Sequence, residues 1–285
     1  MTLTALDHIA MVVHDLDAAE AGLARLLGRP ANWRGGMHGA RHVWFQLGNM
    51  ALDVIAPVGG ETGNKVRERL EKHGEGLWGL GFATGDLAAA QRRMERVGIT
   101  TYGPGVEVST HPETGATREW PSFVTRLRAT HAVNLFFIGH PADAAPWPVS
   151  PIDGSDEGAA VSGLDHVVVR TPDPERAAAL YGARMGLDMR LDRSNPDWGT
   201  RLMFFRCGDL VVEVAHDLNA GVSDGPDSLW GLSWRVPDVA AARARMAAAG
   251  IQVSEVRTGR KPGTAVFTVK DAPGGVPTLV IGPAA

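Results

Sequence analysis

The feature that most constrains this chain is an internal duplication. The segment Leu6-Asp7-His8-Ile9 returns 158 residues later as Leu164-Asp165-His166-Val167. Gly28 returns at the same offset as Gly186, so the spacing is kept across the whole element. Two stretches that share residues in a fixed register fold alike, which predicts two structurally equivalent halves.

A second pair of segments also matches between the two halves. Leu77-Trp78-Gly79-Leu80 returns as Leu229-Trp230-Gly231-Leu232, and Gly98 returns as Gly250, both at an offset of 152. The chain is therefore a repeat of a two-module unit, with a segment rich in Pro, Ala, Asp, Ser and Gly between the copies. The predicted domains are 1–140, with modules 4–60 and 75–140, then a linker over 141–160, and then 161–285, with modules 161–217 and 227–285.

Each module repeats one order of elements. An apolar run comes first, then an aspartate that suits a helix N-cap, then an Ala-, Leu- and Arg-rich helical stretch that stops at a glycine. Strand-like runs follow, and this order predicts an α+β fold, because a doubly wound parallel sheet needs further crossover helices. Residues 106–121 have no counterpart in the fourth module and are predicted as a long loop and candidate lid. The aspartates are Asp15, Asp86, Asp173 and Asp238, and the glycines are Gly28, Gly98, Gly186 and Gly250.

Composition excludes several classes of protein. The formal net charge of −4 provides no basic face for nucleic acid or anionic lipid. No apolar run reaches the ~18 residues of a membrane helix, and the first seven residues lack the order of a secretory signal. The single cysteine, Cys207, rules out an intrachain disulfide framework. We therefore expect a cytoplasmic protein that acts on a small molecule, with no nucleic-acid or membrane partner.

Two acidic residues, Asp53 and Glu213, occupy the same position in the two halves. Each interrupts an apolar run that predicts a buried strand. A lone carboxylate there is costly unless it is paired or bound to a metal ion. With the repeated His8 and His166, the carboxylates make a donor set that suits Fe, Zn, Ni, Co or Mn. The alternative is that strand alternation turns these side chains towards solvent.

A strand–helix–three-strand module used in pairs resembles the vicinal oxygen chelate superfamily. That superfamily includes glyoxalase I, methylmalonyl-CoA epimerase, extradiol dioxygenases, and bleomycin and fosfomycin resistance proteins. The resemblance is carried by the two Leu-Asp-His segments, 6–13 and 164–169, and by the glycine-then-strand elements 48–57 and 208–215. It covers nearly the whole chain outside the linker. It implies two glyoxalase-like domains, each with its modules paired into a cupped mixed sheet.

In that family the metal ligands are a histidine on the first strand and a Glu, Gln or His on the last strand of a module. The resemblance therefore implies His8 and Asp53 as ligands in the first module, and His166 and Glu213 in the third. Modules two and four lack both groups, so each half alone offers only two ligands. The implied site is complete only if the first module meets the third, within the chain or across a homodimer.

Such an ion would polarise two vicinal oxygens of a substrate and stabilise an enediolate or enolate. Asp53 or Glu213 could detach from it and act as the base. The first interpretation is therefore a metal-dependent lyase or isomerase of the glyoxalase or epimerase type. The second is an Fe(II) extradiol-type ring-cleaving dioxygenase, against which the missing histidine and glutamate of the fourth module count. The third is a metal-free protein that binds a small antibiotic or aromatic molecule.

Five further residues are candidates for substrate binding. Arg41 and Arg201 are repeat partners that could hold a carboxylate or phosphate bidentately, or could form surface salt bridges instead. Trp44 and Trp198 are expected to line an apolar cup. His131 precedes the last strand of the second module and is a candidate acid or base.

Overall fold

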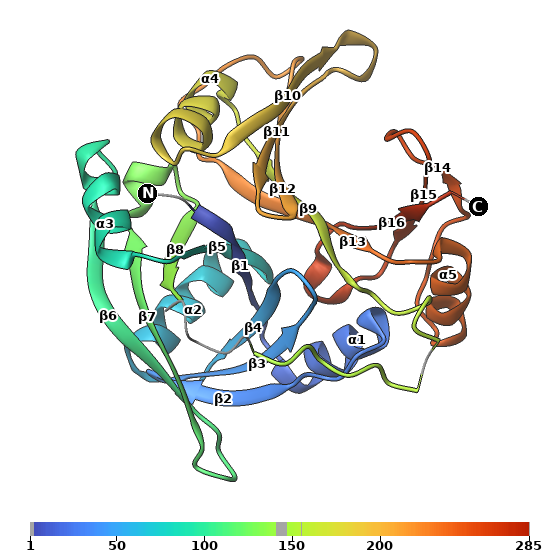
Figure 1. Ribbon diagram of the computed structural model, residues 1–285, viewed down its shortest axis with the longest axis horizontal. Helices are drawn as coiled ribbons and strands as arrows, with labels where there is room; N and C mark the ends of the chain where they lie inside the picture. Colours follow the sequence, from blue (N-terminus) through green and yellow to red (C-terminus); the bar gives the residue numbers. More distant parts are fainter. Residues whose placement is uncertain (1–2, 141–146, 155, 285) are drawn as a thin grey trace.

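The computed structural model describes residues 3–140, 147–154 and 156–284. The strands form two eight-stranded mixed sheets, one from each half of the chain (Figure 1). The predicted α+β architecture, with four modules arranged as two glyoxalase-like domains, is confirmed. Within the described ranges, no helix is both long enough and apolar enough to cross a membrane.

The first sheet is a closed barrel. Its strand order is β1-β4-β3-β2-β6-β7-β8-β5, and the ring closes because β5 pairs antiparallel with β1. The first and last strands of each module lie parallel, β1 with β4 and β5 with β8. The elements are β1 (Leu3–Val12), α1 (Leu16–Leu27), β2 (Trp33–Met37), β3 (Ala40–Gln46), β4 (Ala51–Pro57), α2 (Gly60–His73), β5 (Gly76–Thr84), α3 (Leu87–Arg96), β6 (Thr101–Thr110), β7 (Thr117–Thr125), η1 (Leu127–Thr130) and β8 (Asn134–Gly139).

The second sheet repeats this plan but stays open. Its order is β10-β11-β12-β9-β13-β16-β15-β14, with β10 and β14 at the two edges. In the first barrel the equivalent edges meet where Gly36 pairs with Thr110, whereas no ladder of the described strands joins β10 to β14. The elements are β9 (Gly163–Arg170), α4 (Pro174–Ala178), η2 (Ala179–Arg184), β10 (Asp188–Asn195), η3 (Pro196–Trp198), β11 (Thr200–Cys207), β12 (Leu210–Asp217), β13 (Ser228–Arg235), α5 (Val239–Ala248), β14 (Arg257–Thr258), β15 (Thr264–Val269), η4 (Pro273–Gly275) and β16 (Thr278–Pro283).

All four predicted helix starts are confirmed. The carboxylate of each N-cap aspartate accepts a hydrogen bond from the amide three residues further on: Asp15 from Ala18, Asp86 from Ala89, Asp173 from Arg176, and Asp238 from Ala241. The helix predicted over 175–185 differs, because a short α4 gives way to one π-helical turn, η2. Gly182 lies in that turn, and its low helix propensity favours a departure from α geometry.

One apolar core joins the two halves. Fully buried Leu6 of β1 and Leu164 of β9 belong to the same cluster of side chains. The Asn49 side chain adds hydrogen bonds across the join, since it donates to the Leu164 carbonyl at 2.8 Å and accepts from the Leu164 amide at 2.9 Å. The shared core therefore holds the two sheets against each other.

Helix α2 packs against the inner side of the first barrel (Figure 1). Val66 and Leu70 of this helix form a buried cluster with Val12 of β1 and Ile55 of β4. The predicted module boundaries leave this segment unassigned, so the sequence predicts no helix there. The corresponding connection in the second half, residues 218–227, contains no helix. The inner face of the second sheet is therefore uncovered.

The loop predicted over 106–121 is wrong. These residues belong to β6 and β7, which pair antiparallel from Gly105 and Ser122 out to Thr110 and Thr117. Valine and threonine recur along this stretch, and β-branched side chains favour extended backbone. The segment extends the sheet and brings β6 to β2, so its role is to close the barrel.

Leu70→Ala tests whether α2 is an integral part of the first barrel. Leu70 is 3% exposed, so its truncation leaves a cavity between α2 and the barrel wall and lowers the free energy of unfolding by about 2–5 kcal/mol. Urea denaturation followed by circular dichroism measures this loss. The control Leu218→Ala, at a position 37% exposed, changes stability by less than about 0.5 kcal/mol. Equal effects of the two changes would show that α2 does not fill the barrel.

Candidate functional site

Three polar side chains meet inside the first barrel. His42 Nδ1 lies 2.8 Å from Asp53 Oδ1, and His42 Nε2 lies 2.7 Å from Ser109 Oγ. Trp33 Nε1 donates to the same Ser109 hydroxyl oxygen at 2.8 Å. All three members of the network are buried, at 1%, 3% and 0% exposure. The Asp53 carboxylate is therefore satisfied by its own strand neighbour, as buried polar groups generally are.

His8 lies in the same barrel but outside this network. Its Nδ1 is 2.7 Å from Asp7 Oδ1, and the other oxygen of Asp7 is hydrogen-bonded to His140. Burial opposes the ionisation of Asp7, yet the hydrogen bonds with His140 and His8 outweigh it and hold the pKa of Asp7 well below its usual range. A Cβ on Gly81 would lie 2.5 Å from the His8 ring, so the ring fits only against a glycine.

Aromatic side chains take up further space in this interior. The Trp44 ring is 3% exposed and meets the rings of Trp120 and Trp147 edge-on, with centroids 5.5 Å and 4.7 Å away. The His8 ring lies 5.3 Å from Trp44. The predicted role of Trp44 in lining a substrate cup is wrong, because packed rings and α2 occupy the space inside this barrel.

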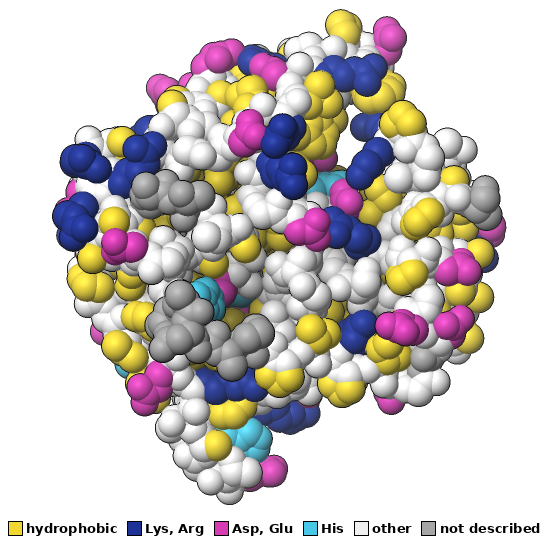
Figure 2. Space-filling view, viewed as in Figure 1, with side chains coloured by type: hydrophobic (Ala, Val, Ile, Leu, Met, Phe, Trp, Pro, Cys, Tyr) yellow, Lys and Arg dark blue, Asp and Glu magenta, His cyan; other side chains and the backbone are white. Residues whose placement is uncertain are grey.

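The uncovered inner face of the second sheet carries the candidate site. His166 of β9 stands opposite Ser233 of β13, and Glu213 lies on the adjacent strand β12. His166 Nε2 is 2.8 Å from Ser233 Oγ and 3.5 Å from Glu213 Oε2. Figure 2 shows a hollow over these strands, with histidine and acidic side chains inside it and Lys or Arg side chains around it. We refer to this hollow as the C-terminal cup.

Hydrogen bonds fix the orientation of the His166 ring. Its Nδ1 lies 2.9 Å from Asp165 Oδ1, and the hydrogen bond with His166 is the main cause that lowers the pKa of Asp165. Because the ionised Asp165 can only accept, Nδ1 carries a proton, and the ring is held with Nε2 at the Ser233 hydroxyl. Nε2 therefore faces the polar centre of the cup.

Glu213 is placed so that it can exchange a proton. Burial raises the pKa of its carboxyl, and the charges of His166 and Arg260 offset this only in part. Its side chain is still 14% exposed, so a ligand in the cup can reach it. A carboxyl whose pKa moves up towards the working pH is the kind that serves as a general acid or base.

The four residues predicted to form one metal site do not come together. His8 and Asp53 belong to the closed barrel, whereas His166 and Glu213 belong to the open sheet. The composite site is therefore wrong within this chain. The physical reason is the strand pairing: β1 pairs with β5 and β9 with β13, so each module joins its neighbour in sequence.

The cup residues also do not fit a resident divalent ion of the kind that the family implies. His166 and Glu213 are its strong donors, but the next inward positions are the Ser233 hydroxyl and the apolar Leu279, which is in register with Ser233. In the described parts of the chain, no three His, Cys, Asp or Glu side chains converge as metal ligands. Protein sites for such ions use three or four protein ligands, so this donor set is too small.

Arg41 and Arg201 point away from both interiors. Arg41 is exposed on β3, where it alternates with the inward-facing His42. Arg201 forms ion pairs with Glu175 at 2.6 Å and with Asp192 at 2.7 Å. The prediction that the two arginines bind substrate is wrong, because strand alternation places them on the outer face. For Arg201, the alternative of a surface salt bridge is the one observed.

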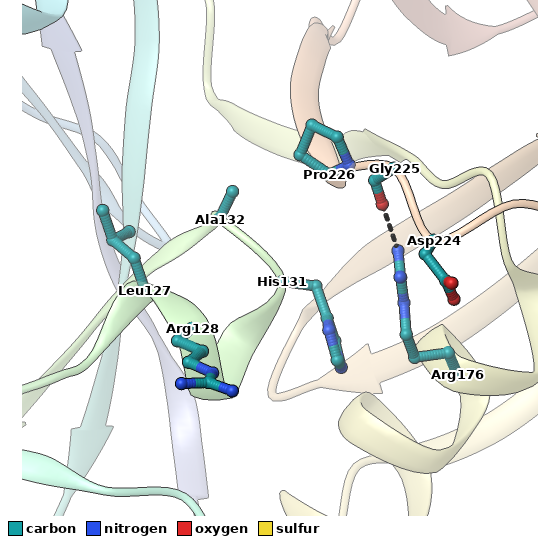
Figure 3. Close-up of a pocket in the computed structure, with 8 residues that line it drawn as sticks. All are labelled: Leu127, Arg128, His131, Ala132, Arg176, Asp224, Gly225 and Pro226. Carbon is teal, nitrogen blue, oxygen red and sulfur yellow. Dashed lines mark hydrogen bonds between the residues drawn. The ribbon is translucent and has the colours of Figure 1, made fainter.

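His131 lies at the boundary between the two halves (Figure 3). It lines a shallow depression of about 360 Å³ together with residues of η1 and of the 224–226 segment. Arg176, across the depression, donates to the Gly225 carbonyl at 2.7 Å. Burial and the Arg176 charge lower the pKa of His131. His131 is therefore not part of the C-terminal cup, because no residue of β9 or β12 lines this depression.

Trp198 is the one predicted substrate-binding residue that lies beside the cup. It ends η3, between β10 and β11, and is 44% exposed. Ser233 is not predicted from the sequence, because matching the modules puts Gly231 at the histidine position. A bulge between Leu229 and Gly231 shifts the ladder and sets Ser233 opposite His166. Residues two apart on a strand share a face, so the spacing of Ser233 from Gly231 is the signal that could have predicted its inward position.

Comparison with known families agrees with this geometry. The model of the Glyoxalase/Bleomycin resistance protein/Dioxygenase superfamily matches residues 7–116 and 165–267. The chain therefore belongs to this superfamily. An ethylmalonyl-CoA/methylmalonyl-CoA epimerase of Cereibacter sphaeroides is 30% identical over an alignment of 97 residues, and the match covers 32% of this chain and 72% of the epimerase.

Solved structures show the same tandem fold. A mutant of 4-hydroxymandelate synthase from Streptomyces coelicolor has a TM-score of 0.71 at 15% identity, covering 100% of this chain and 94% of that one. A fusion of a xylose isomerase-like TIM barrel with a 4-hydroxyphenylpyruvate dioxygenase has a TM-score of 0.64 at 14% identity, covering 100% of this chain and 49% of that one. At such identities the likeness shows the fold alone.

Glu213→Gln tests whether ionisation of the buried Glu213 carboxyl lowers the stability of the protein. Because folding raises the pKa of Glu213, stability is full below the unfolded value of about 4.5 and falls as pH rises through the folded value. The uncharged glutamine removes this loss, so the variant has a Tm higher than the parent by roughly 2 °C at pH 7.5 and equal to it at pH 4. The control Glu68→Gln, on an exposed position of α2, shifts neither value. A lower Tm for Glu213→Gln at pH 7.5 would contradict the raised pKa.

Proposed function

We propose that this protein is an enzyme that transfers a proton at a carbon next to a carbonyl group, with the C-terminal cup as its active site. The observation that carries the proposal is the pair of Glu213 and His166, 3.5 Å apart on the inner face of the open sheet. Glu213 has the raised pKa that suits a general base, and the ring beside it is fixed by Asp165 and Ser233. The reaction is of the isomerase or lyase class, on a small oxygenated substrate.

The chemistry balances without an outside reactant. Glu213 takes a proton from the carbon, and the electron pair of that C–H bond forms the carbon–carbon double bond of an enolate, whose charge lies on the carbonyl oxygen. The Ser233 hydroxyl and the Arg260 guanidinium are the donors near that charge. In an isomerisation the proton then leaves Glu213 and adds to the neighbouring carbon. In an epimerisation a proton from solvent adds to the opposite face of the same carbon, and Glu213 releases its own proton to solvent. His166 holds Ser233 and, through Asp165, is itself held in one orientation.

The similar epimerase supports this reaction type. An epimerase inverts one carbon centre, and in ethylmalonyl-CoA and methylmalonyl-CoA that centre lies between two carbonyl groups, which makes its proton acidic. The reaction in the name of this epimerase is therefore one that a base such as Glu213 can perform. This support is independent of the site, since it comes from sequence identity and not from the placement of side chains.

Ring cleavage by an Fe(II) dioxygenase is less well supported. Likeness to 4-hydroxymandelate synthase concerns the backbone alone at 15% identity. A His, His, Glu set within the last two modules would need a histidine on β13 and a glutamate on β16. Ser233 and Leu279 stand at the inward positions of these strands, beside His166. We therefore favour proton transfer.

A second candidate function is reversible binding of a small molecule without catalysis. The open cup and the exposed Trp198 favour it, because an apolar ring at the mouth suits an aromatic ligand. It differs from the first proposal in one respect, since binding alone does not require that Glu213 exchange a proton with the ligand.

Solvent exchange separates the two functions. Wild-type protein is incubated in heavy water with methylmalonyl-CoA, ethylmalonyl-CoA or small hydroxy-carbonyl compounds, and mass spectrometry follows the uptake of deuterium at the acidic carbon. We expect catalysed uptake into at least one of these compounds. Glu213→Gln slows it by about 100-fold or more, because a general base contributes that much. The exposed control Glu68→Gln keeps the wild-type rate.

The outcomes are distinct. Uptake that persists unchanged in Glu213→Gln would show that another group is the base. Tight binding of a compound with no uptake in any variant would favour the second candidate. If His166→Asn reduced uptake while Glu213→Gln did not, the roles of the two residues would be reversed.

A further inference from the structure

Two guanidinium groups lie over one exposed ring beside the cup. The Cζ atom of Arg260 is 3.9 Å from the centroid of the Trp198 ring, and the Cζ atom of Arg193 is 5.6 Å from it. At these distances each cation is attracted to the aromatic face. Arg193 belongs to β10, Trp198 to η3, and Arg260 follows β14, so the three meet only through the fold.

Neither of these arginines has an acidic partner among the residues that the structure describes. In the described residues no carboxylate lies within ion-pair distance of Arg193 or Arg260, whereas Arg201 and Arg235 of the same sheet are both paired. Two like charges close to one ring repel each other, and an anion bound between them would offset this repulsion. The chain as a whole carries a net charge of −4, so this concentration of positive charge is local.

The group stands where the second sheet fails to close. Arg193 is on the edge strand β10, and Arg260 adjoins the opposite edge strand β14. The ladder runs from Arg193 to Leu202 of β11 and on to Ala215 of β12, two residues from Glu213. Alternate residues of a strand share a face, so Arg193 projects from the same side of the sheet as Glu213. The two cations therefore flank the opening that leads to Glu213.

Arg260 also lies close enough to Glu213 for its charge to affect the ionisation of that carboxyl. Its positive charge is among the influences that lower the pKa of Glu213 against the larger effect of burial. An anionic group held by Arg260 would therefore lie close to the base, and the reacting carbon of the same molecule could reach it. The clamp and the base are in this way parts of one cup.

We propose that Arg193, Arg260 and Trp198 form a clamp for an anionic group of the substrate, a carboxylate or a phosphate. The planar fork of a guanidinium matches both of these groups with two parallel hydrogen bonds. The inference deepens the proposed function, because it rests on the C-terminal cup as the active site and narrows its substrates to anionic carbonyl compounds. The anion comes either from the small molecule itself or from the phosphates of a carrier such as coenzyme A.

Calorimetric titration tests the clamp without requiring turnover. Malonate serves as the carboxylate probe, inorganic pyrophosphate as the phosphate probe, and uncharged malonamide as the blank. We expect one probe to bind saturably and malonamide not to bind. The double variant Arg193→Gln/Arg260→Gln weakens binding by about tenfold or more, because each lost guanidinium removes charge-assisted hydrogen bonds. The matched control Arg92→Gln/Arg96→Gln, on exposed positions of α3, removes the same charge and leaves the affinity within twofold of the parent.

Each result of these titrations has one interpretation. Preference for malonate identifies a substrate carboxylate, and preference for pyrophosphate identifies a carrier phosphate. Glu213→Gln leaves probe binding intact, so a loss of proton exchange with intact binding separates failure of the base from failure of the clamp. Binding of neither probe, or equal binding by the clamp and control variants, overturns the clamp. Thermal melting of each variant confirms that it is folded.

Discussion

The contact between α2 and the inner face of the first barrel is the main difference between the two halves of this molecule. Val66 and Leu70 bury that face against Val12 and Ile55, and the tryptophan rings occupy more of the same interior. In the second half the connection from β12 to β13 is too short for such a helix, and β10 does not reach β14. One half is therefore a filled barrel, and the other is an open cup.

The same position in the two copies shows what this difference does to a carboxylate. Asp53 is 3% exposed and hydrogen-bonded to His42, so internal hydrogen bonding offsets the free-energy cost of burying its carboxylate. Glu213 lies 3.5 Å from His166, beyond hydrogen-bond length for a charged pair, and the effect of burial prevails, so the pKa of its carboxyl is raised. The duplicated position is thus closed off inside the barrel in one half and open to the cup in the other. The buried charge of Glu213 lowers the free energy of unfolding, and such local losses of stability are common at functional sites.

The fold was largely predictable because its signals are local. The aspartate caps and the glycine stops each depend on a few neighbouring residues, and all four aspartates cap the predicted helices. The repeat then gave the number of modules. The candidate site was only partly predictable. His166 and Glu213 were found because both belong to a repeated sequence pattern, whereas the place of Ser233 opposite His166 depends on a bulge in the pairing of β9 with β13.

Pairing between modules was the part that the sequence could not supply. His8, Asp53, His166 and Glu213 share one pattern, which by itself cannot say that β1 closes with β5 and β9 with β13. The outward direction of Arg201 and the interior position of Trp44 follow from the same pairings. Likewise, the clamp of Arg193, Trp198 and Arg260 joins segments that are up to 67 residues apart in sequence.

The central claim is that the C-terminal cup holds Glu213 as a base whose pKa is raised by burial. A carboxyl carbon-13 NMR titration of the intact protein, with Glu213 assigned by comparison with Glu213→Gln, measures this directly. Our account predicts a resonance that titrates above the ordinary value of 4.5 and that moves further up when His166→Asn removes the neighbouring charge. A Glu213 carboxyl that titrates at or below 4.5 would contradict the account.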